Sequence, residues 1–155
     1  MAVNLENYFR IKDILDNNNI NSILYGSLGA SIYLGNFRDF DDIDLLINKD
    51  FLDSKWPELK EIMNKENFIV LDEKEHEFIN SDGIKIAFAG DNVLERDKIC
   101  FLDTDVVEIQ KNGKKVRTIT KEGFVNAYLF SSKDGYRIEK RGRSDLDIVD
   151  SLKKL

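Results

Sequence analysis

Two acidic residues, Asp42 and Asp44, are separated by one apolar residue in the run from Asp41 to Ile47. In a strand, side chains two positions apart point to the same side, and about 7 Å separates their Cα atoms. Two carboxylates on one side repel each other, and a stable fold gains nothing obvious from that arrangement. A hard divalent cation such as Mg²⁺ relieves the repulsion and prefers oxygen ligands. The spacing therefore predicts a metal site at Asp42 and Asp44.

A second chemical feature, Gly26-Ser27, lies upstream between a predicted strand, Ile20–Tyr25, and a predicted short helix, Leu28–Leu34. A glycine that permits close approach, a hydroxyl and the N–H groups of a helix N-terminus can together hold phosphate oxygens. By itself, Gly-Ser after a strand is a common turn, and Asp-x-Asp is most often a solvated strand face. The succession of strand, Gly-Ser, short helix and Asp-x-Asp in a second strand is more specific than either part.

This succession resembles the signature of the nucleotidyltransferase superfamily, which includes DNA polymerase β, the aminoglycoside and lincosamide nucleotidyltransferases and the minimal bacterial nucleotidyltransferases. Tyr25-Gly26-Ser27 and Asp42-Ile43-Asp44 match its pattern, in which an apolar residue precedes Gly-Ser and apolar residues surround Asp-x-Asp. Less specifically, segment 77–91 looks like the next hairpin of small members of this superfamily. Segment 141–148 is similar to the basic start of their last helix.

The resemblance implies transfer of a nucleoside monophosphate from an NTP to an acceptor hydroxyl, assisted by Mg²⁺ or Mn²⁺, with ATP as the expected nucleotide. Asp42 and Asp44 would be the catalytic residues that hold the metal. Gly26 and Ser27 would contact the β- and γ-phosphates. The acceptor stays open among a small molecule, an RNA end and a protein.

One position departs from the family pattern. The family usually places a third carboxylate on the strand that corresponds to Ile84–Ala89. The resemblance puts Ala87 at that position, and Glu77 or Asp91 could take the place of the missing carboxylate. With two acids, a metal-bound nucleotide could still be held, but activation of the acceptor would be impaired. The alternative function is therefore an inactive nucleotidyltransferase-fold protein that acts as a nucleotide-binding, regulatory or partner-binding module.

Composition sets the broad class. With 155 residues, 42% of them hydrophobic and 34% charged, the chain has the make-up of a globular protein, and we expect one nucleotidyltransferase-like domain over residues 1–155. We recognise neither a signal peptide nor a membrane-spanning run, which predicts a cytoplasmic protein with no membrane partner. A homo-oligomer stays open.

The charge is uneven. The net charge is -6, yet segment Lys111–Arg143 carries ten Lys or Arg against three Asp or Glu. Nucleic-acid binding through this segment is the least favoured function, because the chain is acidic overall and the basic pairs are not interleaved with aromatic residues. Four cations are candidates to balance a triphosphate: Lys114, Lys115, Arg141 and Arg143.

Hydrophobic periodicity predicts interleaved helices and strands, hence an α/β (α+β) fold with a mixed β-sheet of about five or more strands flanked by helices. The expected strands are Ile20–Tyr25, Asp41–Asn48, Phe68–Leu71, Glu75–Asn80, Ile84–Ala89, Val106–Gln110 and Lys114–Ile119. The expected helices cover 5–15, 28–34, 52–63 and 124–130, and a last helix opens at Ser144 with a capping-box-like Asp147. His76 is expected as an exposed strand residue, and Cys100 and Trp56 as core residues.

Overall fold

The computed structural model describes residues 4–35, 40–133 and 142–155, with side chains from 145 onward in the last range. In these ranges the strands are β1 Ile23–Tyr25, β2 Ile43–Ile47, β3 Ile69–Asp72, β4 Glu77–Ile79, β5 Lys85–Gly90, β6 Val106–Lys111 and β7 Lys114–Ile119. The helices are α1 Leu5–Asn17, α2 Gly26–Leu34, the 3₁₀ helix η1 Lys49–Leu52, α3 Trp56–Lys65, α4 Val93–Arg96, α5 Leu102–Asp105, α6 Lys121–Ser132 and α8 Gly142–Lys153.

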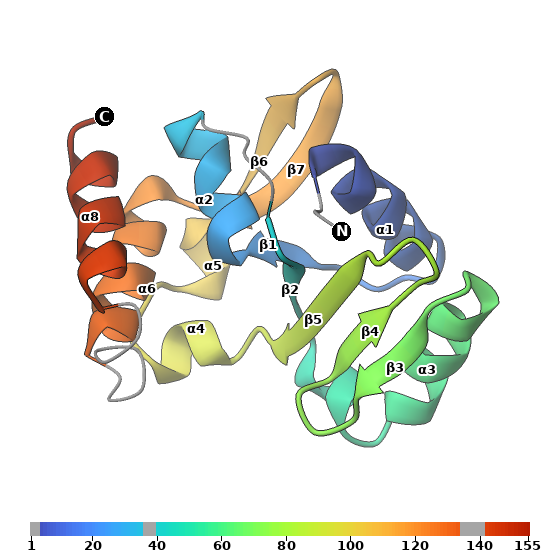
Figure 1. Ribbon diagram of the computed structural model, residues 1–155. Coiled ribbons are helices and arrows are strands. Elements are labelled where there is room, and N and C mark those ends of the chain that lie inside the picture. The colour runs from blue at the N-terminus through green and yellow to red at the C-terminus, as the bar shows by residue number, and fades with distance from the viewer. Residues whose placement is uncertain (1–3, 36–39, 134–141) are drawn as a thin grey trace.

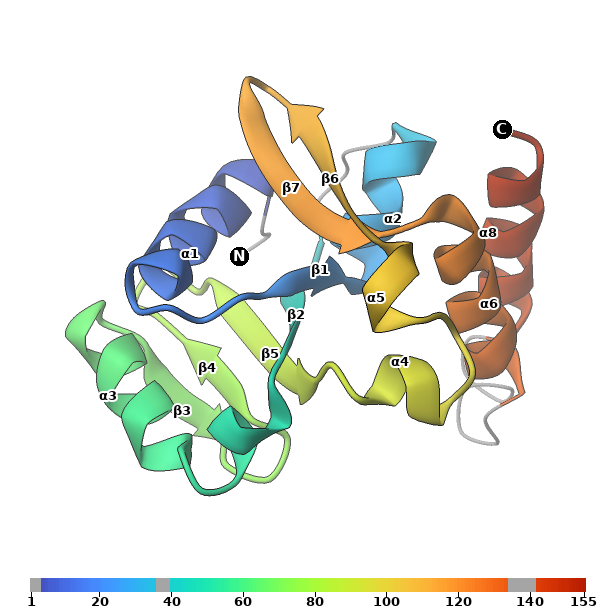
Figure 2. The same ribbon diagram turned by 180° about the vertical axis from the view of Figure 1, so that it is seen from behind.

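The described strands form one seven-stranded mixed sheet in the order β3-β4-β5-β2-β1-β7-β6 (Figures 1 and 2). β2 pairs with β5 in parallel, and β1 pairs with β7 in parallel. The other neighbours are antiparallel, including both predicted hairpins, β4-β5 and β6-β7. The sheet and its helices confirm the predicted α/β class. The described helices are all too short or too polar to cross a membrane.

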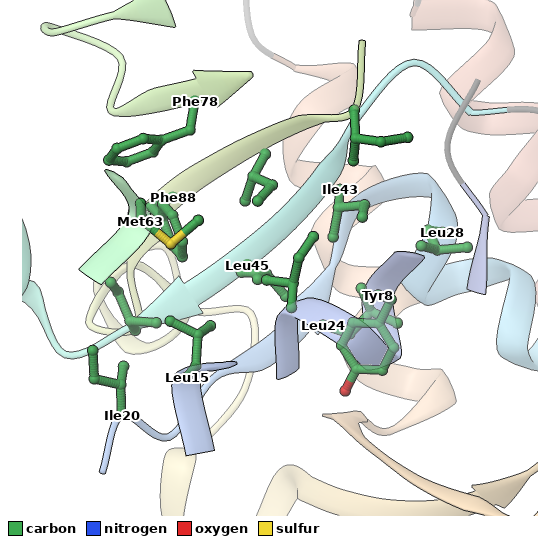
Figure 3. Close-up of a cluster of buried hydrophobic side chains, with 14 of the residues drawn as sticks. Tyr8, Leu15, Ile20, Leu24, Leu28, Ile43, Leu45, Met63, Phe78 and Phe88 are labelled. Carbon is green, nitrogen blue, oxygen red and sulfur yellow. The ribbon is translucent and has the colours of Figure 1, made fainter. Parts of the chain in front are cut away.

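One face of the sheet packs on α1 and α3 and forms the first core (Figure 3). α1 begins where Asn4 and Asn7 cap each other, with each side chain accepting from the other's backbone N–H at 3.0 and 2.9 Å. Its apolar residues then recur at helical spacing and are buried against the sheet: Leu5, Tyr8, Phe9, Ile11 and Leu15.

The opposite face packs on α4, α6 and α8 and forms a second core. Phe124 of α6 is fully buried, and its ring lies 5.9 Å from that of Tyr25 and 6.0 Å from that of Tyr33. Figures 1 and 2 show α6 and α8 side by side at one end of the molecule, away from α3. The helices on this side therefore cover the sheet only in part.

The central strand β2 contributes to both cores. Ile43, Leu45 and Ile47 are fully buried in the first core, whereas Leu46 is buried in the second. Asp44 shares the side of Leu46, because side chains alternate along a strand. Burial of three branched side chains on one face therefore fixes which face receives the carboxylate.

Several predicted boundaries and environments differ from the structure. β1 starts at Ile23, α2 already begins at Gly26, and the short helices α4 and α5 had no clear periodic signal. Trp56 is buried as predicted, and Cys100 is half-buried at the edge of the second core, where burial raises the pKa of its thiol to about 11. The Ser144 side chain lies outside the described residues.

The prediction for His76 was wrong. It lies in the turn before β4, with a φ of 55°, and its ring meets Trp56 edge-on at 4.8 Å. The Asp72 side chain organises this turn by accepting from the N–H groups of Lys74 and Glu75 at 3.0 Å each. The chain reverses direction here so that β3 and β4 can pair in antiparallel fashion. His76 therefore lies in the connecting turn, although the alternating sequence pattern predicted a strand from Glu75.

Tyr8 offers a test of the first core. Its hydroxyl accepts from the backbone N–H of Arg117 at 3.3 Å, and burial raises its pKa to about 12. Tyr8→Phe should lower the free energy of unfolding by about 1 kcal/mol at pH 7, measured by urea denaturation. In the wild type, stability due to Tyr8 is complete below pH 10 and is lost as the pH rises toward 12, since the unfolded tyrosine ionises first. The gap between the two proteins should therefore narrow above pH 10, and a constant gap would contradict this assignment.

Candidate functional site

A cavity of about 580 Å³ opens on the second-core face of the sheet, over β2 and β5 and beside α6. All four residues predicted from the sequence line it: Gly26, Ser27, Asp42 and Asp44. They come from two segments that the antiparallel pairing of β1 and β2 brings together, with Tyr25 opposite Asp44 in the register. The structure thus places the predicted metal ligands and the predicted phosphate contacts at one site.

Asp44 lies directly against Gly26. Gly26 has a φ of +63°, which L side chains rarely adopt, and a Cβ atom built on it would overlap the Asp44 carboxylate and lie only 2.8 Å from its Cγ. Both the backbone conformation and the space therefore require glycine at this position. The same contact holds one carboxylate oxygen of Asp44 next to the start of α2.

The start of α2 is suited to bind an anion. α2 has nine residues, its N-cap residue Tyr25 makes no side-chain capping hydrogen bond, and Gly26 and Ser27 form its first turn. N–H groups in a first helical turn have no partner within the helix and carry a partial positive charge. Together with the Ser27 hydroxyl, they provide donors beside the carboxylates of Asp42 and Asp44.

The donor set fits a hard divalent cation. Asp42 and Asp44 are both half-buried and both line the cavity, and carboxylate oxygens are the ligands that Mg²⁺ and Mn²⁺ prefer. Within the part of the chain that the structure describes, no three His, Cys, Asp or Glu side chains converge on one cation position. The described residues therefore provide a site of two carboxylates, to which phosphate oxygens and water would add further ligands.

The neighbouring strand β5 contributes no acid beside this pair. In the parallel register of β2 and β5, the partner of Asp44 is Ala87, the residue expected in place of the third carboxylate of the family pattern. Three further acids line the cavity, namely Asp41, Glu75 and Glu77, and the last is the partner of Ala87 on β4. Asp91 does not line it.

The lysines proposed for the triphosphate do not line the cavity. Lys115 forms an ion pair with Glu108 at 3.6 Å, and the Lys114 ammonium lies 5.3 Å from the centre of the Phe9 ring. The side chains of Arg141 and Arg143 lie outside the described residues. Among the four basic candidates, the structure therefore describes two, and it places neither at the site.

An aromatic wall was missed by sequence reasoning. Phe124, Ala127, Tyr128 and Ser131 recur at helical spacing along α6 and line the cavity, together with Tyr25, the strand partner of Asp44. Burial raises the pKa of Tyr25, so its hydroxyl is neutral at physiological pH. The spacing is visible in the sequence, but it indicates a buried helix face just as well as a cavity wall.

Comparison with known proteins identifies the family. No family model matches the chain. Bacillus subtilis YnaI, whose name describes it as an uncharacterized protein, is 35% identical over 136 residues, which are 86% of this chain and 84% of YnaI. The chain belongs to the YnaI family. Because YnaI itself is uncharacterized, membership establishes common ancestry without naming an activity.

Solved structures establish the fold of this YnaI-family chain. The lincomycin-bound lincosamide antibiotic adenylyltransferase LnuA matches 99% of the chain and 98% of its own with a TM-score of 0.66, at 17% identity. A nucleotidyltransferase-like antigen of Paracoccidioides brasiliensis matches 98% of the chain and 78% of its own, with a TM-score of 0.67 and 16% identity. The match to the antibiotic-resistance factor ANT(2'')-Ia covers 95% of this chain and 85% of the ANT(2'')-Ia chain, with a TM-score of 0.63 and 15% identity. The YnaI-family chain therefore has the nucleotidyltransferase fold that its motifs resemble.

The contact between Gly26 and Asp44 can be tested by substitution. Gly26→Ala should destabilise the protein more than Gly113→Ala, a matched control with a φ of +77° and open space around its Cα. The left-handed conformation alone should cost the control roughly 1–2 kcal/mol in the free energy of unfolding, measured in urea. At Gly26 the displaced Asp44 carboxylate adds to that cost. Equal losses would show that Asp44 moves aside freely and is not held against the start of α2.

Proposed function

We propose that this protein is a nucleotidyltransferase that transfers a nucleoside monophosphate, with ATP as the expected donor, to an acceptor hydroxyl. The observation that carries the proposal is the position of Asp42 and Asp44 beside Gly26 and Ser27 at one cavity of a nucleotidyltransferase fold. Mg²⁺ or Mn²⁺ held by the two carboxylates would neutralise phosphate charge during the transfer.

The residues of the chain have separate tasks in this proposal. Asp42 and Asp44 would hold the Mg²⁺ or Mn²⁺ ion that binds the nucleotide phosphates. The backbone N–H groups of Gly26 and Ser27, together with the Ser27 hydroxyl, would donate hydrogen bonds to the β- and γ-phosphate oxygens. The acceptor oxygen then bonds to the α-phosphorus while the bond to the bridging oxygen breaks, and pyrophosphate leaves. Positioning and charge neutralisation provide most of the catalysis in such transfers.

ATP and a small hydroxyl-bearing acceptor are supported by the structural neighbours and by the size of the cavity. LnuA is an adenylyltransferase, and ANT(2'')-Ia has been solved with adenylyl-2''-tobramycin. A cavity of about 580 Å³ lies in the range typical of small-molecule sites. The RNA-end and protein acceptors stay as alternatives. We also propose that residues 1–155 form one functional domain and that the protein is cytoplasmic.

A second candidate function is nucleotide binding without turnover, in a regulatory or partner-binding protein. The observation in its favour is Ala87, which leaves no carboxylate on β5 beside Asp44. A protein of this kind would show metal-dependent nucleotide binding and would release no pyrophosphate.

Thermal unfolding with ATP, GTP, CTP and UTP, each with and without Mg²⁺ or Mn²⁺, tests the shared nucleotide site. At a concentration of 100 Kd, bound nucleotide should stabilise the protein by about 2.7 kcal/mol, which raises Tm by roughly 5 to 11 °C. Asp42→Asn should weaken binding by at least 10- to 100-fold, the cost of losing even an outer partner of a metal site. Its stabilisation at the same concentration should then fall to about 0.4 kcal/mol if binding is 100-fold weaker.

The matched control is Asp103→Asn, which removes the same charge at an exposed position of α5 outside the cavity. It should keep the wild-type response to nucleotide and metal. A wild type that shows no metal-dependent shift with any of the four nucleotides would refute both candidate functions.

A further inference from the structure

We propose that Glu77 is the catalytic base of this site and accepts the proton of the acceptor hydroxyl. Glu77 lies on β4, whereas the family pattern has its third carboxylate on the strand that corresponds to β5. The inference rests on the proposed transferase function. In it, the Glu77 carboxylate takes the role of the carboxylate that is missing at position 87. It assigns a role to a residue of β4, two strands away from Asp44.

The strand register places Glu77 in line with the metal-binding pair. Asp44 on β2 pairs with Ala87 on β5, and Ala87 pairs with Glu77 on β4. Side chains of paired residues project from the same face of a sheet, and all three residues line the cavity. Neighbouring strands lie about 4.8 Å apart, so roughly 10 Å separates the Cα atoms of Glu77 and Asp44.

The small side chain of Ala87 leaves the space between these two acids open. A glutamate is one methylene longer than an aspartate and can lean across an alanine, whereas a larger residue at position 87 would block that path. Among the described residues, no side chain hydrogen-bonds to the Glu77 carboxylate or forms an ion pair with it. The carboxylate can therefore turn toward an acceptor in the cavity.

The position of Glu77 suits a base better than a metal ligand. In the described ranges, Glu77 does not join Asp42 and Asp44 in a three-acid cluster around one cation position. Glu77 lies two strands from Asp44 on the same face of the sheet, and the proposal has the acceptor hydroxyl bind between these two acids. A base must lie within hydrogen-bond reach of the proton it removes, and it need not touch the metal.

The other two acids that could replace the missing carboxylate are placed less well. Asp91 follows the end of β5, where its backbone N–H donates to the carbonyl of Ile47 at 2.7 Å. It is four residues beyond Ala87, hence roughly 13 Å further along the strand direction. Glu75 lines the cavity from the exposed turn before β4 and has no partner in the strand ladder.

The proposed step is balanced as follows. The acceptor oxygen forms a bond to the α-phosphorus, its proton moves to the Glu77 carboxylate, and the bond from the α-phosphorus to the bridging oxygen breaks. The electron pair of that bond leaves with pyrophosphate. When no other acceptor is present, water takes its place, and the products are the nucleoside monophosphate and pyrophosphate.

This side reaction provides the assay. Release of pyrophosphate from ATP and Mg²⁺ is measured under single-turnover conditions with protein in excess, next to the Mg-ATP thermal shift of each variant. Glu77→Gln should reduce the rate 10²- to 10⁴-fold, the usual contribution of a positioned base, and should keep the thermal shift. The matched control Glu66→Gln, an identical change at an exposed position outside the cavity, should keep both.

A double variant that puts a carboxylate on β5 distinguishes loss of the catalytic base from a structural effect of the Glu77→Gln substitution. Glu77→Gln combined with Ala87→Asp returns a carboxylate to the face of the sheet one strand closer to Asp44, and it should recover at least tenfold in rate over Glu77→Gln alone. A role of Glu77 in folding alone would not be rescued in this way.

The remaining outcomes overturn the assignment and show which part fails. A Glu77→Gln rate equal to the wild-type rate would exclude Glu77 as the base. Loss of the thermal shift in Glu77→Gln would make Glu77 a metal ligand instead. A wild type that binds Mg-ATP but releases no pyrophosphate would exclude a working base and favour the non-catalytic function. If the wild type shows no nucleotide shift, the proposed function itself fails.

Discussion

The packing of the Asp44 carboxylate against Gly26 is the contact on which the site depends. It brings the start of α2 next to Asp44, and a Cβ at position 26 would displace the Asp44 carboxylate. The contact is possible because β1 and β2 are antiparallel neighbours with Tyr25 opposite Asp44. β2 is held in turn by Ile43 and Leu45, which are fully buried on its other face. Burial on one face of this strand thus positions charge on the other.

The two faces of the sheet differ in role: one forms the larger hydrophobic core, and the other contains the candidate site. The first core, under α1 and α3, is closed and contains the larger share of the buried side chains around the central strands (Figure 3). On the other face, α6 packs on α8 and leaves a cavity over the middle of the sheet. The acids Asp42 and Asp44 and the aromatic residues Phe124 and Tyr128 of α6 all line this cavity. Burial of Ile43, Leu45 and Ile47 in the first core fixes the register of β2, and this register keeps Asp42 and Asp44 together on the second face.

The chain shares its fold with a lincosamide antibiotic adenylyltransferase and differs at one position from the nucleotidyltransferase motif that it resembles. Because Ala87 is the partner of Asp44, two interpretations are open. Either the protein is an enzyme whose catalytic base lies on another strand, or it binds nucleotide without turnover. Glu77, in register on the next strand, is the residue that favours the first view. The difference matters because metal and nucleotide binding need two acids and donors, whereas turnover also needs a proton acceptor.

The local features of the site could be predicted from the sequence. Period-two alternation puts Asp42 and Asp44 on the face opposite Ile43 and Leu45. The order of strand, Gly-Ser and helix predicts a helix after β1, although α2 begins at Gly26, two residues before the expected Leu28. Only the tertiary structure decided which distant residues join them. In the tertiary structure, Glu77 pairs with Ala87, and residues of α6 line the same cavity as the acids. His76 lies in a turn against Trp56, and the Lys114 ammonium lies over the Phe9 ring. These placements depend on strand order and register, which burial over the whole chain selects, and a local pattern of residue types carries no information about them.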